Sequence, residues 1–219
     1  MKTLMLLVLL TVPAQAATVV ELFTSQSCSS CPPADALLTE LDRTRPDLLV
    51  LTYHVTYWDR LGWRDPYSLP AATERQRVYA AHWPQDGLYT PQMVVQGTQQ
   101  AVGSDRPAVL AAIAAAPPAG VALTLTLDAT GLQIGAGVGS GRGTIVLVGF
   151  DRTHTTRVGA GENGGRTLTE TNIVRSVTPV GPWVGSPVHL AANRPAGERT
   201  AVLLQAADGT ILASAILGS

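Results

Sequence analysis

Hydrophobic positions in the first half of the chain alternate between short apolar runs and a helical period. Residues 18–24 (TVVELFT) and 47–55 (DLLVLTYHV) are apolar runs of strand length. Between them, residues 32–44 place their apolar side chains on one face of a helix, and two prolines suit the first turn of that helix. This order of strand, helix and strand predicts a right-handed βαβ unit with parallel strands.

A polar loop over residues 57–70 separates this unit from the next elements. The patterns that follow predict a helix over residues 71–83, a hairpin with strands at 92–95 and 99–102, and a helix over 105–116. A Gln-Gly pair between the two strands indicates the hairpin, and two prolines end the last helix. We therefore expect an α/β domain over residues 17–118, built from a βαβ unit, a helix, a β-hairpin and a helix.

From about residue 119 the helical periods stop, and short alternating runs between glycine-rich turns replace them. Residues 121–127 (VALTLTL) alternate with a strict period of two. Further runs of strand character lie at residues 132–138, 143–151, 172–180, 187–192, 200–206 and 210–217. Several short strands with turn signals predict an all-β, sandwich-like domain over residues 119–219.

Residues 1–16 have the pattern of a secretory signal peptide. Lys2 gives a positive start, residues 4–12 are almost entirely apolar, and Ala-Gln-Ala ends at Ala16. The apolar run is far shorter than the ~20 residues that span a bilayer. We expect cleavage after Ala16, a periplasmic or secreted mature protein, and no membrane association after cleavage. A retained anchor helix is the alternative.

The composition limits the classes of partner. Of 219 residues, 46% are hydrophobic and 14% are charged, which is typical of a globular protein and not of a disordered one. The formal net charge is −1, so the chain has no positive field that would gather nucleic acid or anionic lipid. We therefore expect no nucleic-acid partner.

The two cysteines of the chain, Cys28 and Cys31, lie between the first predicted strand and the first predicted helix. At a helix N-terminus the free N–H groups and the macrodipole favour a thiolate and lower the thiol pKa. Pro32 and Pro33 lack an N–H, so only residues 29–31 can donate towards the Cys28 sulfur. A C-x-x-C pair inside a βαβ unit indicates a redox pair in which Cys28 attacks and Cys31 resolves.

A structural disulfide is the alternative for this pair, because disulfides persist outside the cytosol. The spacing argues against it. In the chain-entropy model, closure of so short a loop contributes only about 2 kcal/mol, and cysteines farther apart in the sequence contribute more.

Four stretches carry a resemblance to known proteins: VVELFTSQSCSSCPPAD, YHVTYWDRLGWRDP, YTPQMVVQG followed by VGSD, and ENGGRTLTETNIVR. With them, from Val19 to Arg175, the chain resembles a family of exported bacterial thioredoxin-like proteins of unknown function, within the thioredoxin superfamily. The resemblance implies a thioredoxin-like fold and a periplasmic or secreted location, but no established reaction. The chain departs from the family at Ser27, where glycine is frequent, and at Thr56, where an acid is frequent.

The resemblance also implies roles for residues outside the cysteine pair. Thr90 and Pro91 are expected to share a cis peptide bond beside the cysteines and to present backbone to a bound peptide. An ordinary trans proline at the start of a strand is the alternative. Glu21, seven residues before Cys28, is the candidate for the buried acid that moves protons for the second cysteine. A solvent-facing glutamate is the alternative there.

Tyr57, Trp58 and Trp63 crowd into the long loop that follows the second predicted strand. One hypothesis is an aromatic wall that grips a polypeptide substrate beside the cysteines. The other is a small satellite core under the loop. Residues 162–166 (ENGGR) predict a glycine-rich hairpin loop, with an anion or partner site as the alternative.

Three hypotheses of function follow. The leading one is an exported thiol–disulfide oxidoreductase, or redox partner, that acts on protein thiols through Cys28 and Cys31 and needs no cofactor. The second is a copper- or zinc-binding protein that uses Cys28, Cys31 and His54, although His54 could instead be hydrogen-bonded within the loop. The third is a non-catalytic binding module with an inert disulfide, whose partner docks on the β domain.

Overall fold

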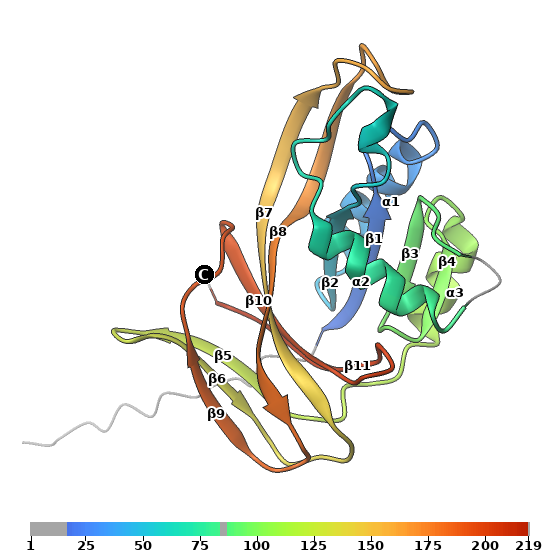
Figure 1. Ribbon diagram of the computed structural model, residues 1–219. Coiled ribbons are helices and arrows are strands. Elements are labelled where there is room, and N and C mark those ends of the chain that lie inside the picture. Colours follow the sequence, from blue (N-terminus) through green and yellow to red (C-terminus); the bar gives the residue numbers. More distant parts are fainter. Residues whose placement is uncertain (1–16, 84–86, 219) are drawn as a thin grey trace, which may run out of the picture.

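The computed structural model describes residues 17–83 and 87–218 (Figure 1), so the predicted signal peptide lies outside the described residues. The described strands form a large mixed sheet and a small antiparallel sheet. The strand order is β11-β10-β7-β8-β2-β1-β3-β4 in the large sheet and β5-β6-β9 in the small one. Within these residues, no helix is both long enough and apolar enough to cross a membrane.

The first half contains the elements that the sequence predicts. Strand β1 (Thr18–Thr24) pairs in parallel with β2 (Leu48–His54), and α1 (Pro32–Thr44) connects them. The remaining elements are η1 (Asp59–Leu61), α2 (Pro70–Ala80), β3 (Gln92–Val95), β4 (Gln99–Val102) and α3 (Arg106–Ala114). Strand β3 is antiparallel to both β1 and β4, so the predicted βαβ unit and hairpin are confirmed.

The second half consists of strands, as predicted, but most of them do not form a separate sandwich. Its strands are β5 (Leu123–Asp128), β6 (Gly131–Ala136), β7 (Gly143–Arg157), β8 (Thr167–Trp183), β9 (Val188–Ala192), β10 (Arg199–Gln205) and β11 (Ile211–Ile216). Strand β8 pairs in parallel with β2, so β7, β8, β10 and β11 extend the sheet of the first half. Alternation identifies a strand but not the edge with which it pairs. The domain division at about residue 118 stays a prediction, and the large sheet contains strands from both sides of it.

Three hydrophobic clusters hold these layers together. One lies between α2 and the large sheet around Phe23, Tyr53 and Tyr79, and another lies under α1 and α3 on the opposite face. The third fills the space between the small sheet and β7, β10 and β11, with Trp183 fully buried in it. Figure 1 shows β7 and β8 as a long twisted pair that runs from the small sheet to the region where α1 begins.

One residue pair, Thr52 and Ile173, aligns β2 with β8. Side-chain hydrogen bonds complete the junction between the two strands. The Thr52 hydroxyl donates to the carbonyl oxygen of Thr171 at 2.6 Å. The Asn172 amide donates to the carbonyl oxygen of Val50 at 3.1 Å, and the Asn172 backbone has a φ of 50°. The strand therefore turns away from the regular ladder at this point, and polar side chains replace ladder hydrogen bonds.

We expect Thr52→Val to lower the free energy of unfolding by about 1–3 kcal/mol, because the buried Thr171 carbonyl loses its donor while the side-chain volume is kept. Urea unfolding followed by circular dichroism measures the change. Thr126→Val, at an exposed position of β5, is the matched control and should change stability by less than about 0.5 kcal/mol. Equal effects of the two substitutions would contradict the role given to Thr52.

Candidate functional site: a buried disulfide beside a cluster of acids and a histidine

Cys28 and Cys31 form a disulfide between β1 and α1. Cys31 is the N-cap residue of α1, so the pair occupies the helix N-terminus that the sequence predicts. Neither cysteine has exposed surface, although Ser29 and Ser30 between them are exposed. The Ser30 hydroxyl lies 3.4 Å from the Cys28 sulfur. The disulfide therefore lies at a helix N-terminus and is covered from solvent.

The segment that covers the cysteines is the loop between β7 and β8, residues 158–166. It is closed as a hairpin by the bond from the Val158 N–H to the Arg166 carbonyl, which confirms the predicted hairpin loop. From this loop, the Asn163 amide donates to the carbonyl oxygen of Cys28 at 2.7 Å. Two sequence motifs more than a hundred residues apart thus meet at one place.

The Thr90–Pro91 peptide bond is cis, as the sequence analysis expects. Pro91 is buried, and its carbonyl oxygen accepts a bond from the Gly103 N–H at 2.9 Å. A Cβ atom at Gly103 would lie 3.0 Å from the Cβ of Ala34 and 3.2 Å from that of Pro91. Glycine at this position therefore lets the proline lie against the first turn of α1, next to the cysteine pair.

Beneath the cysteine motif lies a buried polar cluster centred on His54. Its Nδ1 lies 2.7 Å from an Asp65 oxygen, and its Nε2 lies 3.6 Å from Glu170 Oε1, which is too long for a hydrogen bond. The three side chains are at most 1% exposed. Neither His54 Nε2 nor Glu170 Oε1 has a hydrogen-bond partner among the described residues.

Gln26 connects this cluster to the cysteine motif, two residues before Cys28. Its backbone N–H donates to Asp65 at 2.8 Å, and its amide nitrogen donates to Glu170 at 2.7 Å. Its amide oxygen accepts from the Trp63 indole at 3.2 Å. One fully buried glutamine therefore fixes two acids and an aromatic residue relative to the disulfide.

Asp35 adds a third buried acid, one helical turn after Cys31. Its backbone N–H donates to the carbonyl oxygen of Cys31 at 3.1 Å, and its carboxyl accepts from the Thr24 hydroxyl at 2.9 Å. Burial, reinforced by the nearby charge of Glu170, raises the pKa of Asp35 to about 8. The carboxyl is therefore mostly protonated at neutral pH.

The pKa values of the other groups in the cluster shift in different directions. Burial alone would lower the pKa of His54, but the carboxylates of Asp65 and Glu170 raise it to about 9. Burial raises the pKa of Glu170, whereas the charge of His54 and its bond to Asp65 hold the pKa of Asp65 down against the effect of burial. At neutral pH we therefore assign a charged His54–Asp65 pair beside acids that hold protons readily.

Glu21, the acid that the sequence analysis selects, lies elsewhere. Arg75 pairs with it at 2.6 Å, and the Tyr79 hydroxyl donates to it. These partners belong to α2, whereas Leu22 packs in the cluster under α1. Alternate residues of a strand point to opposite faces, so Glu21 lies on the opposite face of the sheet from α1. Glu21 is fully buried, so the solvent-facing alternative is wrong; its role in proton transfer stays a prediction, and its contacts are those of a structural ion pair.

The three aromatic residues of the loop separate into two groups. Tyr57 and Trp58 pack against the hydrophobic cluster on the α2 face, and the Tyr57 hydroxyl donates to Gln76 at 3.2 Å. Burial raises the pKa of Tyr57 to about 12. Trp63 instead lies against the β7–β8 loop, where a Cβ atom at Gly159 would come within 2.7 Å of its ring. Trp63 is therefore the aromatic residue next to the cysteine motif, and peptide binding by all three stays a prediction.

The described residues contain no group of three His, Cys, Asp or Glu side chains arranged to hold a metal ion. The imidazole of His54 faces Asp65 with one nitrogen and Glu170 with the other. Cys28, Cys31 and His54 therefore do not form a three-ligand site in this disulfide form. The histidine is hydrogen-bonded within the loop, as the alternative interpretation expects.

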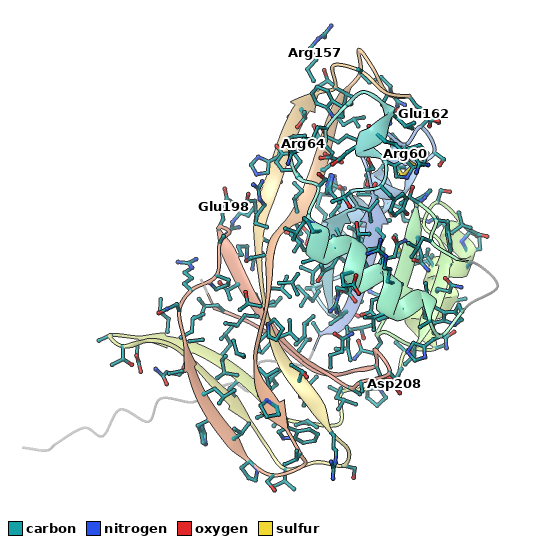
Figure 2. The ribbon with its side chains drawn as sticks, viewed as in Figure 1. Arg60, Arg64, Arg157, Glu162, Glu198 and Asp208 are labelled. Atoms are coloured by element: carbon teal, nitrogen blue, oxygen red, sulfur yellow. A yellow bond between two sulfur atoms is a disulfide. The ribbon has the colours of Figure 1, made fainter. Side chains whose placement is uncertain are left out.

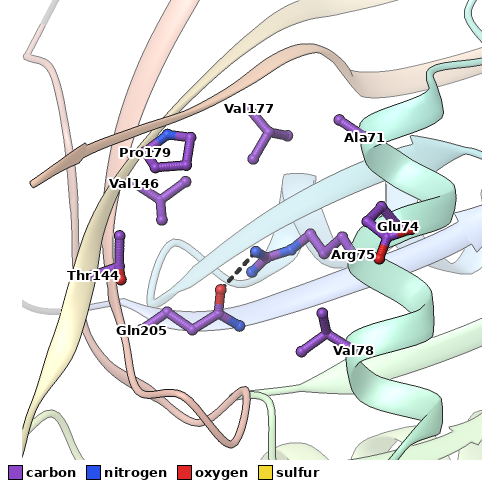
Figure 3. Close-up of a pocket in the computed structure, with 9 residues that line it drawn as sticks. All are labelled: Ala71, Glu74, Arg75, Val78, Thr144, Val146, Val177, Pro179 and Gln205. Atoms are coloured by element: carbon purple, nitrogen blue, oxygen red, sulfur yellow. Dashed lines mark hydrogen bonds between the residues drawn. The ribbon is translucent and has the colours of Figure 1, made fainter.

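A separate cavity of about 390 Å³ lies between α2 and the strands β7, β8 and β10 (Figure 3). Its walls are mainly apolar, and the Arg75 guanidinium donates to Gln205 at 2.7 Å inside it. Its lining comprises Ala71, Glu74, Arg75, Val78, Thr144, Val146, Val177, Pro179 and Gln205. No sequence pattern predicts this cavity, because its residues come from elements far apart in the chain.

The sequence analysis does not predict the acids of this cluster, although the sequence contains one signal for them. Glu170 is a charged residue between the buried positions Leu168 and Asn172 of a period-two strand. A charge at the inward phase of such a strand indicates a buried polar site. Asp35 and Asp65 gave weaker signals, because acids are also common at helix starts and in turns.

Comparison with known proteins identifies the family of this chain and shows solved structures of similar fold. Residues 19–205 match the family described as "Protein of unknown function (DUF1223)". The X-ray crystal structure of a protein from Agrobacterium tumefaciens is similar at 33% identity and a TM-score of 0.81, over 94% of this chain and 97% of that one. HBP35 of Porphyromonas gingivalis, at 10% identity and a TM-score of 0.59 over 93% of this chain and 75% of that one, is similar in fold alone. No curated protein matches the chain.

We expect Asp35→Asn to flatten the pH dependence of stability. The folded protein keeps the Asp35 proton up to about pH 8, whereas the unfolded chain loses it near 3.8. Between these values the folded state binds more protons, so the free energy of unfolding falls as pH rises, by at most about 1.4 kcal/mol per pH unit. Urea unfolding between about pH 5 and pH 8 should therefore show a smaller fall in the variant.

His54 contributes a change of the same sign, because its pKa is raised from 6.5 to about 9, and it remains in both proteins. Asp35 also helps to raise the His54 pKa, so its loss reduces the His54 contribution and flattens the slope in the same direction. Glu74→Gln, at an exposed position of α2, is the control and should keep the wild-type slope. Identical slopes for wild type and the Asp35 variant would show that this carboxyl is ionised in the folded protein.

Proposed function

Because the chain belongs to the DUF1223 family of unknown function, we propose from its own site that it is an exported thiol–disulfide oxidoreductase, or redox partner, acting on protein thiols. One observation carries the proposal: the Cys28–Cys31 disulfide lies at the start of α1, beside the cis Thr90–Pro91 bond. The signal-peptide pattern of residues 1–16, and a disulfide as the state of the only two cysteines, support a periplasmic or secreted location.

The order of elements supports a thioredoxin-like assignment for the first half. Strands β2-β1-β3-β4 are neighbours in that order, with β1 and β2 parallel and β3 antiparallel to β1. Helix α1 follows β1, and the cis-proline precedes β3. This arrangement places the N-terminus of α1, with its two cysteines, and the start of β3, with its preceding proline, at the same end of two neighbouring strands.

The exchange begins when a substrate thiolate attacks the Cys28 sulfur, which forms a mixed disulfide and breaks the bond to Cys31. Cys31 leaves as a thiolate and takes up a proton. A second substrate thiol loses its proton and attacks the mixed disulfide, which releases Cys28. The substrate has then lost two electrons and two protons and holds a disulfide, and the protein has gained both as a dithiol.

Asp35 is the group best suited to protonate Cys31. It lies one helical turn from Cys31, it is buried, and its raised pKa keeps a proton on it at neutral pH. A buried acid whose pKa lies near the working pH can donate and then recover a proton. The charges of Glu170 and His54 lie close enough to affect this pKa.

We expect Cys28→Ser to abolish exchange with a peptide disulfide, because no thiolate remains at this position to attack it. Cys31→Ser should instead trap mixed disulfides at Cys28, because the resolving thiol is lost. Mass spectrometry after incubation of each reduced variant with a disulfide-containing peptide distinguishes the two results. Equal reactivity of wild type and the Cys28 variant would refute the mechanism.

A non-catalytic module with an inert disulfide is the second candidate, and the complete burial of both cysteines favours it. The reduction potential of the Cys28–Cys31 couple separates the two candidates. A value between roughly −120 and −270 mV lies in the range of working oxidoreductases. A value below about −300 mV is typical of structural disulfides and would support the binding module.

A further inference from the structure

The β7–β8 loop makes polar contacts with the cysteine motif at two adjacent residues. The carboxylate of Glu162 accepts from the Ser29 N–H at 2.9 Å and from the Ser29 hydroxyl at 2.7 Å. The next residue, Asn163, is fully buried and donates to the carbonyl oxygens of Cys28 and Gln26, at 2.7 and 3.1 Å. The contacts therefore clamp the backbone on both sides of the Cys28 side chain.

The loop is built to hold these two side chains in place. The Arg166 guanidinium donates to the Asn163 oxygen at 2.8 Å, which orients the amide towards the cysteine motif. Gly161 has a φ of 74°, and a Cβ atom there would lie 3.0 Å from the Ser27 hydroxyl. A side chain at this position would push the loop away from the motif.

Glu162 competes directly with the Cys28 thiolate. Pro32 and Pro33 have no N–H, and the Cys31 N–H already donates to the Cys28 carbonyl oxygen at 3.2 Å, so the N–H groups of Ser29 and Ser30 remain for a thiolate at Cys28. Glu162 accepts from the Ser29 N–H and so places a negative charge at the residue next to Cys28. Like charge disfavours a thiolate, and loss of a donor disfavours it further.

We propose that Glu162 is a positioning residue that latches the β7–β8 loop over the disulfide, so that exchange at Cys28 requires an incoming thiol substrate to displace it from Ser29. The inference rests on the proposed function for its biological meaning, but the latch itself concerns only the chemistry of Cys28. When the loop is released, the Cys28 sulfur becomes accessible, and the Ser29 N–H becomes free to donate to it.

The substrate class follows from what the released site offers. Once the loop has left, the Ser29 N–H and hydroxyl are free donors, and the carbonyl oxygens of Cys28 and Gln26 are free acceptors. A flexible peptide whose backbone N–H and carbonyl groups flank its cysteine can satisfy them, whereas a thiol buried in a rigid fold cannot reach them. We therefore assign the site to extended, unfolded or loop cysteines.

The test uses the mature full chain and a small reductant, so it does not depend on a physiological substrate. Dithiothreitol is oxidised to its cyclic disulfide while Cys28 and Cys31 are reduced, and two electrons and two protons pass to the protein. The rate of this reaction is compared for wild type, Glu162→Gln and Glu198→Gln. Glu198 is a matched control, because it is also exposed and its carboxylate also accepts from a backbone N–H, that of Arg152 at 3.1 Å.

Figure 2 shows Glu162 beside the loop that follows β1 and Glu198 on the other side of the β7–β8 pair. We expect Glu162→Gln to be reduced about tenfold faster than wild type, and the control to be unchanged. The apparent pKa of the Cys28 thiol, from the pH profile of iodoacetamide alkylation of the reduced protein, should fall by about one unit. Gly161→Ala is the second variant, and its displaced loop should also speed reduction.

Reduction rates and alkylation profiles that are the same for wild type and Glu162→Gln would overturn the latch. So would faster reduction of Gly161→Ala without any effect of the Glu162 variant, because the loop would then act by coverage alone. Failure of the proposed function has a different signature: no exchange with peptide thiols by any variant, together with an intact Glu162 effect on dithiothreitol. That result would support the latch and refute the oxidoreductase.

Discussion

The buried pairing of His54 with Asp65 and Glu170 is the interaction on which the rest of the structure depends. His54 ends β2, Asp65 belongs to the loop after it, and Glu170 lies on β8 from the second half of the chain. Removal of one partner from a buried ion pair leaves an uncompensated charge and typically costs about 3–5 kcal/mol. The cluster therefore requires the loop and the distant strand to be in place together.

Gln26 extends this constraint to the disulfide. It binds Asp65 and Glu170 at once, and the chain reaches Cys28 two residues later. The cysteine pair is consequently positioned from below by a polar network and from above by the β7–β8 loop. In the first half alone, the helix N-terminus would be open to solvent on the side that this loop covers.

The long β7–β8 hairpin is thus more than an extension of the sheet. Its inner part joins β2 through Thr52 and Asn172, its middle supplies Glu170, and its end supplies Glu162 and Asn163. The same hairpin therefore joins the sheet, supplies a buried acid and contacts the cysteine motif.

The sequence by itself determined the local structure and the position of the cysteine pair. The apolar runs and the helical period predict the βαβ unit with Cys28 and Cys31 before its helix, because these features depend on neighbours in the chain, whereas the cis bond before Pro91 is expected from the family resemblance. Only the tertiary structure decided the pairing of β8 with β2 and the face on which Glu21 lies. The cluster around His54 and the contact of Glu162 with Ser29 join residues far apart in sequence, and hydrophobic periodicity carries no information about which distant side chains meet.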